Sequence, residues 1–351
     1  MKKNILAIAI ASAVAAPVAM ADAPTVYGQF NVAIDSTSID KHDTYNLDTD
    51  TPGTADSASA MDVVNRNSRV GVKGSSDLGN GLKAVYQLET TVNVPNGGDK
   101  KSSFGGARNT FVGVAGGFGT VVMGRHDSPL RMIQPSDGFA DSAYAGNNTS
   151  NFNGNLSGED RLDEVVAYLS PDFNGIKFAV ALSGQKGLEG TNDAGVADDQ
   201  ALTNGTSMNV TYGSKKSGIF AAVGQTTAVG GDYSVTRATV QYNEAGLLAS
   251  FMYNQEKDVG NSMTIGAAYK MGALTPRAKM SMITYDKNFT DESATNMAIG
   301  VDYALGKTTR VYAEYAALGE NSLYTTVAAN GDEILRNASR SAMSVGLFHK
   351  F

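Results

Sequence analysis

Segments of about ten residues in which apolar and polar side chains alternate recur along most of this chain. The pattern is clear in VYGQFNVAID (26–35), SRVGVKG (68–74) and TRVYAEYA (309–316). Because successive side chains of a strand point to opposite faces, each segment predicts a β-strand with one apolar and one polar face. No window after residue 21 reaches 18 apolar residues, which excludes transmembrane helices. With 39 glycines, the chain is therefore predicted to be all-β.

The connections between these segments alternate between short and long. Seven are short turns carrying the Gly, Asn or Pro that reversal of antiparallel strands requires: 77–81, 116–119, 170–175, 214–218, 243–246, 271–274 and 305–307. Eight are longer and mostly polar: 36–60, 95–103, 127–160, 185–205, 228–232, 257–261, 287–293 and 319–337. Fifteen connections predict sixteen antiparallel strands.

The sixteen strands are expected near 25–35, 62–74, 81–93, 104–115, 119–126, 161–170, 176–184, 206–214, 219–227, 233–243, 246–256, 262–271, 275–286, 294–304, 308–317 and 338–351. Short turns at one end, long loops at the other and an even strand number are typical of a bacterial outer-membrane β-barrel. A soluble sandwich or propeller is disfavoured because its loops need not alternate in length. Closure also leaves no unpaired strand edge in the bilayer.

The N-terminus predicts export. MKKNILAIAIASAVAAPVAMA combines two lysines, an apolar run from Ile5 to Val18 and a small-x-small triplet, which together make a cleavable signal peptide. Residues 1–21 are therefore expected to be removed, and residues 22–351 to form a single barrel domain. A membrane anchor is disfavoured because the apolar run is short. In an exported barrel, the apolar faces should meet lipid and the polar faces should meet water inside.

Composition excludes several classes of function. Without Lys2 and Lys3 the chain has 26 basic residues against 35 acidic ones, so nucleic acid is not an expected partner. It has no cysteine, and its three histidines are too scattered for a metal site. GGFGTVVMG (116–124) is a hairpin turn rather than a phosphate-binding loop. We expect no catalytic residue, no metal and no cofactor.

Five stretches carry a family resemblance: TVYGQFN (25–31), NSRVGVKGSSDLGNGLKAVYQLE (67–89), RNTFVGVAGGFGTVVMGRHDSP (108–129), VAYLSPDFNGIKF (166–178) and the terminal VGLFHKF. With them the chain resembles the general porins of Gram-negative bacteria, in particular the neisserial and β-proteobacterial branch. The likeness spans the whole mature chain. One departure is Phe348, where the family usually has a basic residue.

The resemblance implies a sixteen-stranded, trimeric barrel in the outer membrane, whose third extracellular loop (127–160) folds inward and narrows the pore. Such a protein is no enzyme: ions and small hydrophilic solutes diffuse passively through its water-filled channel. Two alternatives stay open. A substrate-specific channel, for a sugar or an anion, would share the architecture, and a structural or adhesive barrel would have a plugged lumen. The implied partners are two further copies of the chain, outer-membrane lipid and lipopolysaccharide, and the outer-membrane assembly machinery.

By resemblance, the basic wall of the pore constriction falls on Arg69, Arg108, Arg125 and Arg161, with Arg66 and Lys73 as further candidates, facing Asp137 and Asp141 on the loop. Strand alternation independently supports Arg69, which opposes Val70 and Val72. The same alternation is less clean for Arg161, because it leaves Glu164 facing lipid. Cationic walls favour anions, whereas acidic residues in the long loops would attract cations. Screening over about 8 Å gives more weight to the constriction, so anion preference is favoured.

The chain ends on an aromatic residue. Met343, Val345, Leu347 and Phe351 lie at odd positions and therefore share one face of the last strand. That face is expected to meet lipid, with Phe351 among the aromatic residues at the membrane interface. The resemblance further implies that the assembly machinery recognises Phe351.

Overall fold

The computed structural model describes residues 23–46, 51–95, 103–136, 139, 144, 156–184, 202, 204–228, 233–286, 292–322, 333–336 and 338–351. Within these ranges the structure is antiparallel β-sheet, with a single turn of helix, α2 (Pro129–Met132). That helix, the sole one in the described ranges, is too short to cross a membrane.

The strands that build the main sheet are β1 (Thr25–Ile39), β4 (Ala58–Asn65), β5 (Arg69–Gly79), β6 (Leu82–Val92), β7 (Phe104–Ala107), β8 (Thr110–Gly116), β9 (Gly119–Asp127), β10 (Arg161–Leu169), β11 (Ile176–Ser183), β12 (Gly205–Ser214), β13 (Ser217–Ala228), β14 (Ser234–Glu244), β15 (Leu247–Glu256), β16 (Gly260–Tyr269), β17 (Leu274–Tyr285), β18 (Ser293–Ala304), β19 (Thr309–Leu318) and β21 (Arg340–Lys350). A separate three-stranded sheet contains β2 (His42–Asn46), β3 (Thr51–Ala55) and β20 (Glu333–Arg336).

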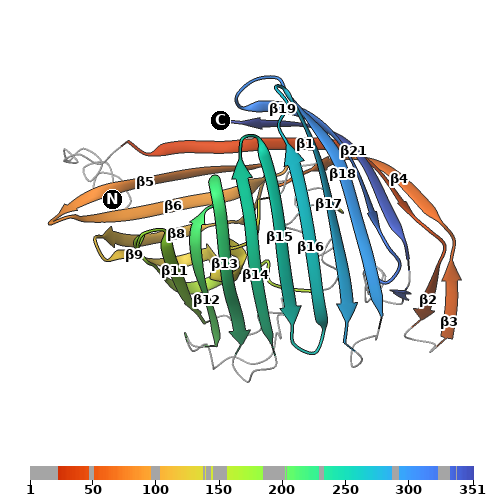
Figure 1. The fold of residues 1–351 in the computed structure, drawn as a ribbon, viewed down its shortest axis with the longest axis horizontal. Helices are drawn as coiled ribbons and strands as arrows, with labels where there is room; N and C mark the ends of the chain where they lie inside the picture. The colour runs from red at the N-terminus through yellow and green to blue at the C-terminus, as the bar shows by residue number, and fades with distance from the viewer. Residues whose placement is uncertain are drawn as a thin grey trace, which may run out of the picture.

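The main sheet closes on itself as a barrel (Figure 1). β1 pairs with β21 along one edge and with β4 and then β5 along the other. β7 and β8 likewise follow each other along β6, so the eighteen strands fill sixteen positions around the ring. The predicted sixteen-stranded antiparallel barrel is confirmed, and pairing of the first strand with the last closes the ring.

The predicted short turns are found at one barrel end, where they join β5 to β6, β8 to β9, β10 to β11, β12 to β13, β14 to β15, β16 to β17 and β18 to β19. At the other end one predicted long connection is short, since only residues 257–259 lie between β15 and β16. The sheet of β2, β3 and β20 was not predicted. It joins backbone from the first and last long connections, which are far apart in sequence and lack a sustained period-two pattern.

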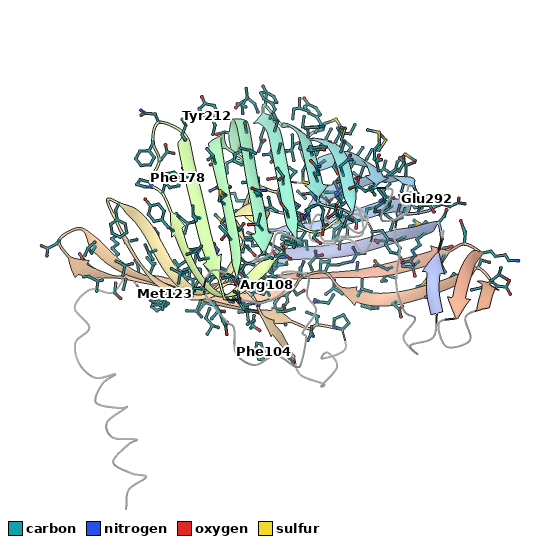
Figure 2. All side chains as sticks on the ribbon, turned by 90° about the horizontal axis from the view of Figure 1, so that it is seen from below. Phe104, Arg108, Met123, Phe178, Tyr212 and Glu292 are labelled. Atoms are coloured by element: carbon teal, nitrogen blue, oxygen red, sulfur yellow. The ribbon has the colours of Figure 1, made fainter. Side chains whose placement is uncertain are left out.

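Side-chain exposure shows which face of each strand meets the interior. On β21, Met343, Val345 and Leu347 are exposed, whereas the alternate residues Ala342 and Ser344 are 2% and 1% exposed. Figure 2 shows Phe178 and Tyr212, two further exposed side chains, projecting away from the barrel wall. The apolar face therefore lies outside and the polar face lines the interior, as predicted for a membrane barrel.

A β-bulge in β10 explains why alternation was ambiguous for Arg161. The pairing with β9 shifts between Leu162 and Val165, and Glu164 has a φ of 52°. The extra residue shifts the alternation of inward and outward side chains by one position, so the orientation of Glu164 does not follow from that of Arg161. The bulge lies at the loop end of the strand, where the 127–160 connection returns to the barrel wall.

The chain terminus closes the barrel. The N–H of Phe351 donates to the Gly28 carbonyl at 3.1 Å, and the Gly28 N–H donates to the Phe351 carbonyl at 3.1 Å. A Cβ on Gly28 would lie 2.5 Å from the Phe351 ring, so glycine permits this close approach. The same ring packs at 5.5 Å from the ring of Phe30, on the outer face. The predicted outward position of Phe351 is confirmed.

Candidate functional site

Most of the barrel interior is lined by buried polar side chains. They alternate with exposed apolar residues along each strand, as Asn296 does with Met297. Examples are Gln29, Asn31, Asp35, Ser207, Asn209, Arg237, Gln241, Asn254, Thr264, Arg277, Lys279, Ser281, Asn296, Glu314 and Ser344. We call this surface the inner face.

Arg69 and Arg108 meet at one carboxylate of the inner face, Glu89. Arg108 Nε lies 2.6 Å from Glu89 Oε1, and Arg69 Nε lies 3.8 Å from Glu89 Oε2. The Tyr27 hydroxyl donates to Glu89 Oε2 at 2.9 Å, and Lys73 Nζ lies 5.0 Å from the centre of the Tyr27 ring. Register places Glu89 here because it pairs with Gly71 on β5. Two basic residues predicted for the pore wall therefore contact an acid that the sequence prediction omitted, and the third, Lys73, lies over the ring of the tyrosine bound to that acid.

Arg66 lies at the break between β4 and β5, where it begins a chain of buried charges. It pairs with Asp35, lies 3.4 Å from Glu314 Oε1 and donates to Ser344 Oγ at 2.8 Å. Glu314 Oε2 lies 2.9 Å from an Arg277 nitrogen. All four charged side chains are at most 3% exposed.

The chain of charges continues toward the short-turn end of the barrel. Arg277 also pairs with Asp302, and Asp302 Oδ2 lies 3.3 Å from Arg310 Nε. Acids and arginines thus alternate across β1, β17, β18 and β19 on the inner face. We call Asp35, Arg66, Glu314, Arg277, Asp302 and Arg310 the charge chain.

Arg161 belongs to a separate cluster at the loop end. Its guanidinium lies 3.0 Å from Asp127 Oδ1, and its Nε donates to Asn109 Oδ1 at 2.8 Å. Arg131 Nε, at the end of α2, lies 3.1 Å from the same Asp127 oxygen. Arg125 lies apart from these contacts, because it pairs with Asp163 and its Nε donates to the Ala107 carbonyl at 3.0 Å.

The described residues at the start of the 127–160 connection contact the inner face. The N–H of Leu130 donates to Ser207 Oγ at 3.1 Å, and Asn209 Nδ2 donates to the Pro129 carbonyl at 2.6 Å. Further along, the N–H of Ser136 donates to Gln241 Oε1, on β14, at 2.8 Å. These bonds tie the segment to β12 and β14.

One part of the inner face departs from the predicted polarity. Val122, Leu162, Val165, Ala167, Ala181 and Val235 form an apolar patch there, and Leu130 and Ile133 pack against it with no exposed surface. Because apolar surface inside a water-filled barrel is unfavourable, the patch is stabilised by the two side chains that cover it. It therefore determines where the segment 128–134 lies.

Further described residues of the same connection contact other parts of the wall. Phe139 packs on Ala298, Ala316 and Leu318, with the Arg277 guanidinium 4.9 Å from its ring centre. The N–H of Ser157 donates to Glu256 Oε2 at 2.6 Å. These contacts extend from β15 to β19, so the described residues of this one connection touch most of the wall from β12 onward.

Two groups beside this segment have shifted pKa values. Burial, reinforced by the charge of Arg237, lowers the pKa of Lys215 to about 8. Its ammonium donates to the Met132 carbonyl at 2.7 Å. Burial raises the pKa of the Glu159 carboxyl, against the opposing effect of Arg237, which lies 2.8 Å away. Both groups are held where the connection meets the wall.

Basic residues of the inner face that sequence reasoning missed include Arg237, Arg277, Lys279 and Arg310. Each lies opposite the exposed residues of its strand, so the alternation that supported Arg69 could have identified them. The predicted acids Asp137 and Asp141 lie outside the described residues. The described residues contain no group of three side chains arranged to hold a metal ion.

Comparison with known proteins agrees with this geometry. A family model described as Gram-negative porin matches residues 7–322. The major outer membrane protein P.IB of Neisseria meningitidis serogroup A is 29% identical over the full length of both chains.

Solved porins share the fold. The anion-selective porin from Comamonas acidovorans superposes with a TM-score of 0.71 at 21% identity, covering 95% of this chain and 100% of that chain. The trimer form of OmpT from Vibrio cholerae gives a TM-score of 0.60 at 16% identity, covering 94% and 100%. The chain therefore belongs to the Gram-negative porin family, and is an outer-membrane porin, a channel rather than an enzyme.

Proposed function

We propose that this porin is a general diffusion channel whose 127–160 connection folds into the lumen and narrows it. The observation that carries the proposal is the contact of Leu130, Ile133 and Phe139 with the inner face of the barrel. A segment bound on that face occupies space that would otherwise be water. Ions and small hydrophilic solutes would pass between this segment and the opposite wall.

The proposed basic wall consists of Arg66, Arg69, Lys73, Arg108 and Arg161, with Arg125 at the loop-side entrance of the same pathway. The assignment to this wall is best supported for Arg69 and Arg108, since both contact Glu89 on the inner face. We assign Asp137 and Asp141 as the acids that face this wall from the loop. Opposed charges across a narrow, wet passage create a field that orients and selects permeating ions.

We further infer a preference for anions. Four of the wall acids are each shared between two arginines: Glu89 by Arg69 and Arg108, Glu314 by Arg66 and Arg277, Asp302 by Arg277 and Arg310, and Asp127 by Arg131 and Arg161. An acid that already contacts two cations offers little attraction to a permeating cation. The name of the Comamonas porin, anion-selective, supports the same preference.

Replacing both Asp137 and Asp141 with asparagine is expected to increase the anion-to-cation permeability ratio by a factor on the order of two, because two negative charges leave the narrowest region. The reversal potential of reconstituted channels in asymmetric KCl measures this ratio. Asp77→Asn, at the exposed end of β5, is the matched control and should leave the potential unchanged. An unchanged potential in the double variant would remove both aspartates from the constriction.

We also propose that residues 1–21 are removed on export, that residues 22–351 form the mature domain, and that three copies assemble. The named trimer form of Vibrio cholerae OmpT supports the trimer. The exposed apolar outer face offers the surface that lipid, lipopolysaccharide and neighbouring copies would contact. The assembly machinery would recognise the last strand, which ends on Phe351.

Deleting Phe351 is expected to reduce the amount of protein assembled in the outer membrane severalfold, while the conductance of assembled channels stays unchanged. The deletion removes two backbone hydrogen bonds to Gly28 and the packing on Phe30, all distant from the 127–160 connection. Outer-membrane fractionation gives the amount, and bilayer recording gives the conductance. Phe173→Ala, an exposed aromatic residue at the same barrel end, is the control. Normal assembly with altered conductance would refute the role assigned to Phe351.

A further inference from the structure

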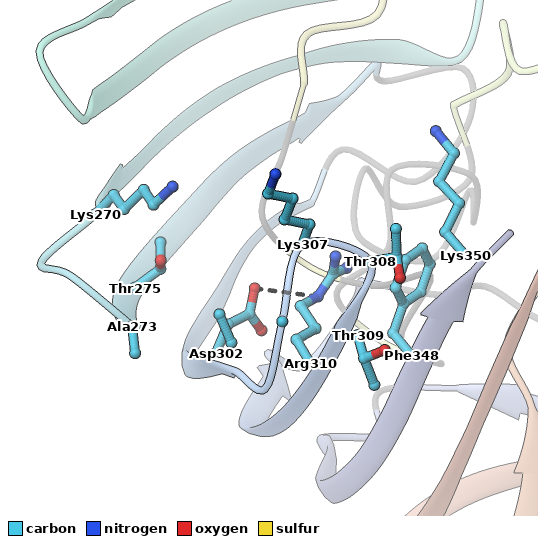
Figure 3. Close-up of a pocket in the computed structure, with 12 residues that line it drawn as sticks. Lys270, Ala273, Thr275, Asp302, Lys307, Thr308, Thr309, Arg310, Phe348 and Lys350 are labelled. Carbon is cyan, nitrogen blue, oxygen red and sulfur yellow. Dashed lines mark ion pairs between the residues drawn. The ribbon is translucent and has the colours of Figure 1, made fainter.

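A recess of about 600 Å³ lies at the short-turn end of the barrel, and no described residue of the 127–160 connection lines it. It is lined by the ends of β17, β18, β19 and β21 and by the turns between β16 and β17 and between β18 and β19. Figure 3 shows Lys270 and Lys350 at opposite sides of this space, with Lys307 and Arg310 between them. Basic side chains from separate elements therefore surround a single recess.

Strand register places this recess on the inner face. Arg310 pairs with Phe348, and Phe348 pairs with Asn31, whose side chain is fully buried in the barrel interior. Asp302 pairs with Tyr312, which donates to Asn31 Oδ1 at 2.8 Å. Antiparallel partners share a face, so the recess opens to the lumen and not to lipid.

The charge of the recess is strongly positive. Four basic side chains line it, Lys270, Lys307, Arg310 and Lys350, against one carboxylate, Asp302. Asp302 is already engaged by Arg277 and Arg310 through the charge chain. No described acidic side chain forms an ion pair with Lys270, Lys307 or Lys350, and all three are exposed. Their ammonium groups are therefore available to a ligand.

Arg310 is held in place more firmly than the lysines. Its guanidinium carbon lies 4.1 Å from the centre of the Phe348 ring, and its Nε lies 3.3 Å from Asp302. Stacking and the ion pair orient the planar guanidinium group of Arg310, whose remaining N–H groups can bind an oxyanion. Thr308 also lines the recess, and its hydroxyl adds a further donor.

We propose that this recess is a binding site for small, multiply charged oxyanions at the short-turn mouth of the channel. Several converging donors favour a ligand that presents several charged oxygens, since each oxygen can take a charge-assisted hydrogen bond. A monovalent ion such as chloride would be attracted by the field without bridging the lysines. The site rests on the proposed function only in that its occupancy should reduce the current through the channel.

Isothermal titration of the purified, detergent-solubilised protein with inorganic pyrophosphate tests the site without requiring conduction. We expect saturable binding in the wild type. The double variant Lys307→Gln/Lys350→Gln should bind about tenfold more weakly, because two unpaired charges are lost from the recess. Lys177→Gln is the matched control: it removes a cation from the same barrel end, and Lys177 pairs with Asp172 outside the recess. The control should bind like the wild type.

Bilayer recording supplies the second readout. Pyrophosphate on the short-turn side should reduce the current at lower concentration than on the loop side, and the double variant should need about ten times more. Equal affinity in the wild type and the double variant, or weakening by Lys177→Gln of the same size, would overturn the proposal. Binding in the titration without any channel current would instead refute the diffusion function and leave the oxyanion site standing.

Discussion

Replacing Arg66 with methionine is expected to destabilise the folded barrel by about 3–5 kcal/mol, which is the usual cost of leaving a buried charge without its partner. Arg66 is the one ion-pair partner that the described residues give Asp35, and both side chains are 3% exposed. Glu314 loses one contact but keeps Arg277 at 2.9 Å. Asp35 is therefore the buried charge that is left without an ion-pair partner. The transition temperature of the purified protein in detergent, followed by circular dichroism, measures the loss.

A second variant separates charge from packing in this prediction. Asp35→Asn/Arg66→Met removes both charges and should recover most of the lost stability, because no buried charge remains unpaired. Arg125→Met is the control, since Arg125 and Asp163 are 29% and 49% exposed and such a pair contributes about 0–1 kcal/mol. If Arg66→Met and Arg125→Met lower the transition temperature equally, the charge chain does not stabilise the wall as described.

Replacing Leu130 and Ile133 together with aspartate is expected to raise the single-channel conductance. The two side chains are fully buried on the apolar patch of the inner face, and burial contributes about 1.5–3 kcal/mol for each. Carboxylates cannot replace them there without a large desolvation cost, so the segment 128–134 should leave the wall. The patch and the segment would then both face water, and the path for ions would widen.

The control for this variant is Met132→Asp. Met132 lies on the same turn of helix but is partly exposed, and it contributes its carbonyl rather than its side chain to Lys215. Its replacement should leave the conductance near that of the wild type. Should the Leu130/Ile133 variant fold, insert and conduct like the wild type, the segment does not narrow the pore.

The barrel could be predicted from sequence because two local signals agreed. Alternating side chains identified the strands, and turn residues such as Asn80 and Gly81 identified the reversals. The bulge at Glu164 could not be predicted, because one inserted residue changes the parity of everything after it without changing composition. Arg161 stayed ambiguous for that reason.

The contacts of the wall were less predictable than its faces. Alternation shows that Arg69 points inward, but which acid it meets depends on the register with β6, which places Glu89 opposite Gly71. The apolar patch was missed for a different reason. Val122 and Val235 lie at positions of their strands that point into the barrel. An apolar residue at such a position suggests that the strand register has been assigned wrongly, unless a segment that covers the residue is known. The segment that covers them, 128–134, directly follows the strand that carries Val122 and reaches Val235 on β14.

Planar-bilayer recording of the purified wild-type protein tests the central claim most directly. An open, water-filled barrel predicts stable current steps that close in groups of three, with a reversal potential in asymmetric KCl that indicates preference for anions. A folded, membrane-inserted protein that carries no current would contradict the account, because the lumen would then be plugged.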